Sequence, residues 1–241
     1  MKKRTRYMKV IFFCCIALLL TPAIVHAGKK GRIYLGSHEQ ILREIPTTEK
    51  LVALSFDDGP NPRYTPQVLD LLKQYNAKAT FFVIGSRVEK FRDLVQREAM
   101  EGHEVANHSY RHTFKKLSEK EFKEDLTKAQ KAIYYATGHF SHLYRPPGGY
   151  YDEMTIHLAK SEGYIIVLWS KDTRDWSKPG VDKIVHQVLD HLHNGDIILF
   201  HDHGRDRGQT IQALAKILPE IQAKGYQCVT ISELLKTKAS P

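Results

Sequence analysis

The chain has 241 residues, of which 42% are hydrophobic and 26% are charged, and its formal net charge at pH 7 is +9. These proportions place it among globular proteins, and α/β barrels commonly occupy this length as a single unit. The positive charge alone would suggest a nucleic-acid or membrane partner, an interpretation that the N-terminus weakens.

Residues 1–27 are typical of a secretory signal peptide. Five basic residues precede an unbroken apolar run from Val10 to Leu20, and Val25-His26-Ala27 offers small residues at the positions that a signal peptidase reads. The run is too short for an ordinary membrane span. We therefore expect cleavage, a secreted or cell-wall-associated mature protein and no stable membrane span. An uncleaved N-terminal membrane anchor is the alternative.

Removal of this segment lowers the net charge from +9 to +4, because it contains five basic residues and no acidic one. We therefore predict no nucleic-acid partner. Two of the three cysteines, Cys14 and Cys15, lie in the apolar run. Only Cys228 remains after cleavage, so no intrachain disulfide can form. Cys228 stands in an apolar stretch and is predicted to be a buried thiol.

Residues 28–49 are polar, and we interpret them as an N-terminal segment leading into a domain at 50–235, with a short tail at 236–241. From residue 50 onward, short apolar runs alternate with helix-like stretches. The predicted strands are Leu51–Phe56, Ala79–Ile84, His103–Ala106, Leu143–Arg145, Tyr164–Trp169, Asp196–Phe200 and Gln227–Ile231. The predicted helices are Thr65–Tyr75, Ser86–Met100, a helix with a capping box at Ser118–Glu121 that continues to Ile133, Asp152–Glu162, and apolar stripes at Val181–Leu192 and Ile211–Ile221.

Repeated strand–helix units favour a parallel sheet with helical crossovers. We predict an α/β fold with a single (β/α) barrel, small and incomplete or distorted. An open doubly wound sheet is the alternative. Chemically capable residues follow several strands directly. Because the C-terminal ends of parallel strands share one face, residues as far apart as Asp57 and His201 are expected to converge there.

Two adjacent carboxylates, Asp57 and Asp58, follow the first strand. A simple turn would explain them, but two neighbouring carboxylates repel each other, and a metal ion would relieve that cost. His108 and His112 have the i,i+4 spacing that places two rings on one face of a helical turn, in reach of one ion. Together with Asp58 they form a set of two imidazoles and one carboxylate, which leaves positions open for water and substrate.

Three further segments could each be structural when taken alone. Arg145 precedes Pro-Pro-Gly-Gly, which suggests a rigid loop, although the guanidinium could hold a carboxylate by a bidentate pair. The segment 172–176 could be a solvated loop. His201 ends a buried apolar strand, where histidines are often core residues.

Together and in this order, the five segments closely resemble the five motifs of the NodB-homology polysaccharide deacetylases (carbohydrate esterase family 4), over roughly residues 50–235. The resemblance implies a metal-dependent hydrolase that acts on carbon–nitrogen bonds other than peptide bonds. It implies that Asp58, His108 and His112 bind a divalent metal, with zinc expected first and cobalt, manganese or nickel as alternatives.

The resemblance also implies the roles of four further residues. They are Asp57 as the general base, Arg145 as the group that keeps this base ionised and aimed, His201 as the general acid toward the leaving amine, and Asp175 as the residue that orients or tunes His201.

The substrate groove departs from the family pattern at one position. The resemblance implies that Leu199 and Trp176 shape the pocket for the acetyl methyl group and that the Gly148 N–H helps to stabilise the oxyanion. The family often has an aromatic residue where Gly148 stands. We expect Tyr150 or Tyr151 to replace this groove wall and to stack on a sugar ring.

The expected activity is removal of N-acetyl groups from an amino-sugar polysaccharide, with peptidoglycan N-acetylglucosamine as the first candidate and chitin oligomers next. The alternatives are an O-acetyl esterase on a polysaccharide, a catalytically inactive sugar-binding module on the same fold, and a metal-dependent phosphatase or nuclease. Binding alone would not need Asp57, Arg145 and His201 together, and a phosphatase or nuclease often needs two metals and more carboxylates than this single set supplies.

Overall fold

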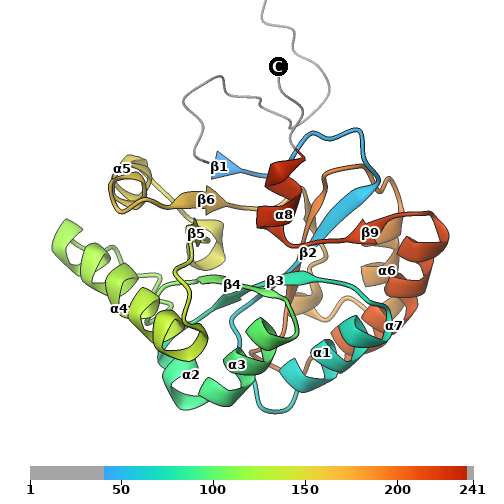
Figure 1. The fold of residues 1–241 in the computed structure, drawn as a ribbon, viewed down its shortest axis with the longest axis horizontal. Coiled ribbons are helices and arrows are strands. Elements are labelled where there is room, and N and C mark those ends of the chain that lie inside the picture. The colour runs from blue at the N-terminus through green and yellow to red at the C-terminus, as the bar shows by residue number, and fades with distance from the viewer. Residues whose placement is uncertain (1–40, 238–241) are drawn as a thin grey trace, which may run out of the picture. The chain divides into compact units, whose positions relative to one another are not determined.

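The structure is a computed structural model that describes residues 41–237, so the predicted signal peptide lies outside the described residues. Its sheet runs in the order β1-β6-β5-β4-β3-β2-β8-β7, with β9 paired to β2, and it curls into an incomplete barrel (Figure 1). The strand pairs are all parallel, which confirms the predicted (β/α) fold. The strands are β1 (Ile41–Leu42), β2 (Leu51–Asp57), β3 (Ala79–Val83), β4 (Glu104–Asn107), β5 (Leu143–Tyr144), β6 (Ile165–Val167), β7 (Lys171–Asp172), β8 (Ile197–His201) and β9 (Gln227–Cys228).

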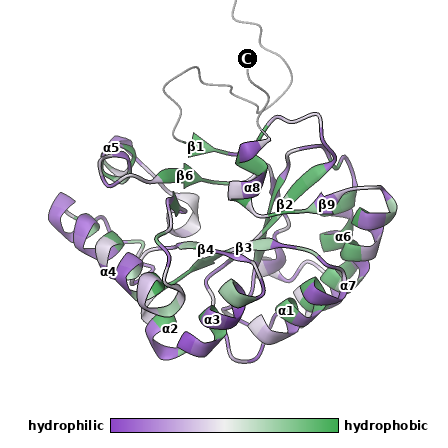
Figure 2. Ribbon diagram, in the orientation of Figure 1, coloured by the Kyte–Doolittle hydropathy of each residue, from purple (hydrophilic) through white to green (hydrophobic). Residues whose placement is uncertain are grey.

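Most of the helices connect strands and cover the outside of the curled sheet, with apolar faces turned inward (Figure 2). The predicted capping box of α4 is present, since the Ser118 side chain accepts from the Glu121 N–H and Glu121 accepts from the Ser118 N–H. The helices are α1 (Thr65–Gln74), α2 (Gly85–Lys90), α3 (Arg92–Met100), α4 (Glu119–Thr137), α5 (Glu153–Ser161), α6 (Val181–Leu189), α7 (Gly208–Ala223) and α8 (Ile231–Lys236), with short 3₁₀ turns η1 (Pro147–Gly149) and η2 (Asp175–Ser177).

The strands have two differently packed faces. On one face Phe56 stacks between Phe81 and Phe200 of the neighbouring strands, at ring-centroid distances of 5.1 and 5.5 Å. Side chains alternate along a strand, so Asp57 and His201 point to the other face, into the barrel. Apolar residues of α8, among them Ile231 and Leu234, join the cluster on that inner side. The barrel interior is therefore a packed core, and Asp57 and His201 lie at the C-terminal ends of its strands.

The segment that follows β1 helps to close the barrel. Glu44 forms an antiparallel bridge with Asp196, and the Ile45 N–H donates to the Gly195 carbonyl at 2.9 Å. Gly195 has a φ of 83°, and a Cβ there would lie 1.8 Å from the Ile45 carbonyl oxygen, so only glycine fits this close approach. The sheet thus includes residues before position 50, where the sequence places the start of the domain.

Three element predictions need correction. The stretch 86–100 forms two helices, α2 and α3, because Phe91 leaves the helical region with φ −132° and ψ 48°. Gly85 at the start of α2 approaches α4 so closely that a Cβ would lie 2.7 Å from the Ala129 Cα, so tertiary packing fixes the direction of α2. The last predicted strand ends at Cys228, because Thr230 and Glu233 form the capping box of α8. The short strands β1 and β7 were not predicted.

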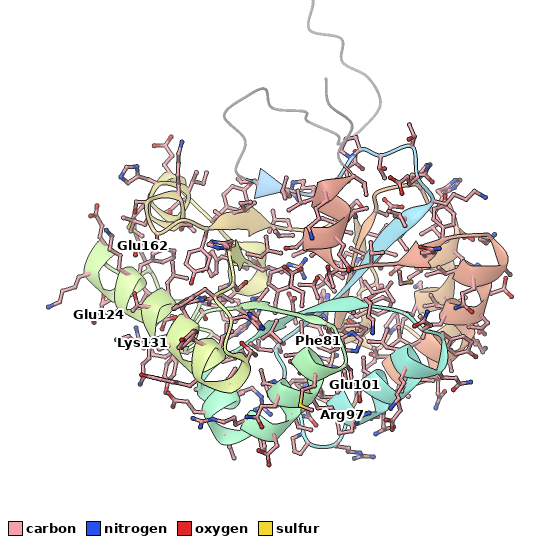
Figure 3. The ribbon with its side chains drawn as sticks, viewed as in Figure 1. Phe81, Arg97, Glu101, Glu124, Lys131 and Glu162 are labelled. Carbon is pink, nitrogen blue, oxygen red and sulfur yellow. The ribbon has the colours of Figure 1, made fainter. Side chains whose placement is uncertain are left out.

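Among residues 41–237, no helix is long and apolar enough to cross a membrane. The surface carries ordinary ion pairs, such as that of Arg97 with Glu101 on α3 at 2.8 Å (Figure 3). Cys228 is buried, as predicted, and burial raises the pKa of its thiol to about 12. This thiol is therefore protonated and packed at neutral pH.

Candidate active site and metal centre

The predicted acid–base pair lies on two adjacent strands. Asp57 ends β2 and His201 ends β8, and the two residues are directly opposite each other in the parallel register. This placement confirms the expected convergence of residues distant in sequence, because both strands bring their C-terminal ends to one face.

Arg145 holds Asp57 from inside the barrel. Its guanidinium is fully buried, and its Nη1 donates to Asp57 Oδ1 at 2.7 Å. The pair is not the bidentate fork that the sequence suggested. Nη1 also donates to the Ser55 hydroxyl, while Nε and Nη2 donate to the carbonyls of Val167 and Leu168 at 3.0 and 2.9 Å. These bonds satisfy the buried charge and fix the orientation of the guanidinium beside Asp57.

Three side chains converge as a candidate metal-ligand set. His112 Nε2 lies 3.0 Å and His108 Nε2 lies 3.4 Å from Asp58 Oδ1. One ligand atom from each of Asp58, His108 and His112 lies within 4.8 Å of the others, so a single ion could contact all three. Two imidazole nitrogens and one carboxylate oxygen match the composition of three-ligand catalytic sites for zinc and similar ions.

The two histidines converge through a loop and not through the helical turn expected from their spacing. Ser109 and His112 both have left-handed backbone conformations, with φ of 65° and 49°. The loop is held by its own polar groups, since the Ser109 N–H donates to Asn107 Oδ1 and the His112 N–H donates to Ser109 Oγ, each at 2.9 Å. The i,i+4 spacing therefore correctly predicted that His108 and His112 lie together, but a loop brings them together and not a helical turn.

Hydrogen bonds prepare this set for a cation. His108 Nδ1 lies 2.7 Å from the Arg145 carbonyl oxygen, which can only accept, so the proton is on Nδ1 and Nε2 is free to act as a ligand. Burial alone would raise the pKa of Asp58, but the neighbouring His108 and His112 side chains outweigh it and hold that pKa well below its ordinary value. Asp58 is therefore ionised, and it lies beside two imidazole nitrogens that could serve as ligands.

His201 has a complete set of partners on the other side of the site. Its Nδ1 lies 2.8 Å from Asp175 Oδ1, and its backbone N–H donates to Asp175 Oδ2 at 3.0 Å. The Thr210 hydroxyl also donates to Oδ2, at 2.8 Å. Burial acts to lower the pKa of His201, but Asp175, together with Asp57 and Asp58, outweighs it, so this pKa lies above its ordinary value. The ring is held in one orientation by Asp175.

The predicted groove residues lie around this centre. Leu199 is buried on β8, on the same face as His201 two residues later, and Trp176 projects from η2 with half of its surface exposed. Gly148 adopts φ 62° in η1. A side chain at Gly148 would meet the Tyr150 ring at 2.9 Å and the Phe114 ring at 3.0 Å. Two aromatic rings thus occupy the space beside this glycine.

Three contributors to the site were not identified from the sequence. Ser55 lies two residues before Asp57 on β2, and its hydroxyl accepts a hydrogen bond from Nη1 of Arg145. Phe114 packs edge-on against His112, with ring centroids 5.1 Å apart. Asp202 lies behind Gly59, accepts from the Thr65 hydroxyl, and has a pKa raised to about 7 by burial. Only Asp202 had a sequence signal, because it directly follows the strand-end histidine.

A sequence model of the family described as polysaccharide deacetylase matches residues 44–167. This match contains the candidate metal ligands and Arg145, while His201 lies beyond it.

Named relatives match most of the chain. A peptidoglycan-N-acetylglucosamine deacetylase of Bacillus cereus is 49% identical, over 81% of this chain and 92% of the relative. A chitooligosaccharide deacetylase of a Bradyrhizobium species is 38% identical, over 76% of this chain and 90% of the relative. A crystal structure of the peptidoglycan N-acetylglucosamine deacetylase Bc1960 superimposes with a TM-score of 0.79 and 36% identity, covering 84% of this chain and 96% of the other.

Proposed function

The chain belongs to the polysaccharide deacetylase family, and from that membership we propose that it removes N-acetyl groups from the N-acetylglucosamine of peptidoglycan in a metal-dependent reaction. Chitin oligomers are the next candidate substrate, because a chitooligosaccharide deacetylase is a more distant relative. The observation that carries the proposal is the placement of Asp57 and His201 opposite each other, beside a three-ligand set.

Asp58, His108 and His112 would hold the metal. The donor set fits a divalent ion of the zinc type, and the Nδ1 proton of His108, which points to the Arg145 carbonyl, leaves Nε2 for the ion. Zinc is our first choice, with cobalt, manganese or nickel as alternatives. When bound, such an ion polarises a carbonyl oxygen and lowers the pKa of water.

The protein supplies the two proton transfers. Asp57, held by Arg145, accepts a proton from the attacking water as its oxygen bonds to the acetyl carbon. His201, held by Asp175, donates a proton to the amine nitrogen as the carbon–nitrogen bond breaks. The products are acetate and a free amino sugar. The Gly148 N–H helps to stabilise the developing oxyanion, and Leu199 and Trp176 enclose the acetyl methyl group.

We also propose how the chain is organised. Residues 1–27 direct export as a cleaved signal peptide, so that the enzyme meets the cell wall outside the cell. The catalytic domain also includes β1 and the segment that follows it, before residue 50, because Glu44 and Ile45 bond to residues that precede β8.

Acetate release tests the proposal. Purified protein would be assayed on peptidoglycan and on chitin oligomers, with and without a chelator. We expect faster release from peptidoglycan, loss of release with the chelator, and recovery on addition of zinc. Release that is indifferent to the chelator would overturn the metal-dependent mechanism. Faster release of acetate from ester-acetylated xylan than from either polymer would favour the O-acetyl esterase alternative.

A further inference from the structure

A pocket of about 470 Å³ lies between the loop that follows His112 and the segment from Pro147 to Thr155. It is separate from the acid–base residues Asp57 and His201, neither of which lines it. The reaction described above therefore gives this pocket no role.

The pocket opens beside the metal-ligand set. Ser109, which lies between the two candidate histidine ligands, forms part of its lining. Phe114 also lines it and packs edge-on against His112, with centroids 5.1 Å apart. Tyr150 packs edge-on against Phe114 in turn, at 6.3 Å. A glycan whose acetyl group reaches the metal site would thus pass this aromatic pair.

The pocket walls offer aromatic surface to solvent. Phe114 is 68% exposed and Tyr150 is 76% exposed, while Phe122 and Tyr144 are buried in the lining. Exposed aromatic rings in a concave site are suited to contact with the apolar faces of sugar rings. These rings also fill the space beside Gly148. Phe114 and Tyr150 therefore lie where the family often has an aromatic residue at the position of Gly148.

Two lysines and two aspartates line the pocket, and the two aspartates are held by hydrogen bonds within the protein. Asp125 is bonded to Arg111 Nε at 2.8 Å and to the Tyr110 N–H at 2.7 Å. Asp152 accepts from the Thr155 N–H and hydroxyl at 2.9 and 2.8 Å.

Lys115 and Lys116 are exposed, and neither forms an ion pair within the described part of the chain. Lys116 acts electrostatically on Asp152, but both aspartates are engaged by other groups of the protein through hydrogen bonds, whereas neither lysine side chain is, among the described residues. Together with the aromatic walls, the two ammonium groups fit a sugar that carries an acidic substituent.

We propose that this pocket is a subsite for the acidic substituent of a sugar next to the one that is deacetylated. Aromatic rings Phe114 and Tyr150 contact the glycan, and Lys115 and Lys116 bind its carboxylates. This inference deepens the proposed function and depends on it. In peptidoglycan, alternate sugars carry a lactyl ether that ends in a carboxylate or in a peptide with carboxylates, whereas chitin is uncharged. The pocket would thus give the enzyme its preference for peptidoglycan.

The test removes the negative charge of the substrate and the positive charge of the pocket in separate experiments. The substrates are a peptidoglycan oligosaccharide with free carboxylates, the same oligosaccharide with its carboxylates amidated, and an N-acetylglucosamine oligomer. The proteins are the wild type, the double variant Lys115→Gln/Lys116→Gln, and a matched double variant Lys73→Gln/Lys131→Gln. Both control lysines are exposed, on α1 and on α4, outside this pocket (Figure 3 labels Lys131).

We expect wild-type kcat/KM to be higher for the acidic than for the amidated oligosaccharide. The pocket double variant should lower that ratio by about fivefold, mainly through KM, because two exposed ion pairs each contribute modestly. The effect should shrink at high salt, since exposed charges are screened. The control double variant should keep the wild-type ratio.

Aromatic truncation gives a second measurement. Phe114→Ala should lower kcat/KM several-fold on both the acidic and the amidated oligosaccharide, because ring contact does not depend on the carboxylate. Phe140→Ala is the control, since Phe140 is also exposed, stacks on Tyr134 of α4 and does not line this pocket.

The outcomes separate this inference from the proposed function. Acetate release from all substrates with the same acidic-to-amidated ratio in every protein would overturn the subsite and leave the deacetylase function intact. A ratio lowered equally by both double variants would also overturn it, because general surface charge would then be the cause. No acetate release by metal-loaded wild type from any substrate would refute the proposed function itself.

Discussion

The two sides of the active site hold their histidines in different ways. On the β8 side, both oxygens of Asp175 are hydrogen-bonded, and two of these bonds fix His201. On the other side, His108 and His112 both turn a ring nitrogen toward one oxygen of Asp58. The His201 side has all its hydrogen-bond partners within the protein. On the other side, two imidazole nitrogens lie around the Asp58 carboxylate, in the arrangement of a candidate metal site.

Backbone conformation does not divide the two sides. Asp58, Ser109 and His112 have positive φ, between 49° and 75°, and Arg174 and Lys178, at the two ends of η2 beside Asp175, also have positive φ, of 53° and 55°. The difference between the sides therefore rests on their side-chain contacts. From these contacts we propose that a cation completes the metal side, formed by Asp58, His108 and His112.

Removal of a metal ligand should give the largest effect. His112→Ala should lower kcat/KM for acetate release by about a thousandfold or more, because the Lewis-acid contribution is worth several kcal/mol. Metal content, measured on the same samples, should fall with activity. His157→Ala on α5 is the control, since that histidine lies outside the ligand set. An active, metal-free His112→Ala protein would contradict the division between the two sides.

Removal of the candidate acid should uncouple activity from metal binding. His201→Ala should lower kcat by about a hundredfold to ten-thousandfold, the range typical of general acid–base catalysis. Its metal content should match that of the wild type, because His201 is not one of the three ligands. Wild-type kcat in this variant would remove His201 from the mechanism.

Arg145 connects the two sides, because its side chain holds Asp57 and its carbonyl accepts from His108. Arg145→Lys keeps the charge but cannot reproduce the planar set of donors. We expect kcat/KM to fall by about tenfold to a hundredfold through misplacement of Asp57. The metal-binding affinity should change less, because the backbone carbonyl is retained. A larger change in metal affinity than in kcat would show that its main role is on the metal side.

The smallest expected effect is a shift of the pH profile. Asp175 raises the pKa of His201 above its ordinary value, so the acid form persists to higher pH in the wild type. Asp175→Asn should move the alkaline limb of kcat to lower pH, by about one unit. The shift should be read against wild type loaded with the same metal, because coupled groups titrate together. An alkaline limb that stays in place would mean that Asp175 only orients the ring.

Part of this structure could be predicted from the sequence because it depends on local patterns. Buried apolar runs such as Asp196–Phe200 predicted the parallel strands, and Ser118 with Glu121 predicted the start of α4. The order of chemically capable residues after the strands predicted that Asp57 and His201 would meet. Parallel topology makes such convergence a consequence of strand direction alone.

Only the tertiary structure decided the features that depend on how distant segments pack against one another. The direction of α2 follows from the close approach of Gly85 to α4, and the bonds of Arg145 follow from where the carbonyls of Val167 and Leu168 lie. Phe114 had no sequence signal, because nothing local reveals that its ring reaches His112 and the space beside Gly148. The sequence by itself determined the chemistry of the site, since residue types and strand ends are local properties. The shape of the groove was decided only by packing, because it depends on distances between side chains of segments that are far apart in the sequence.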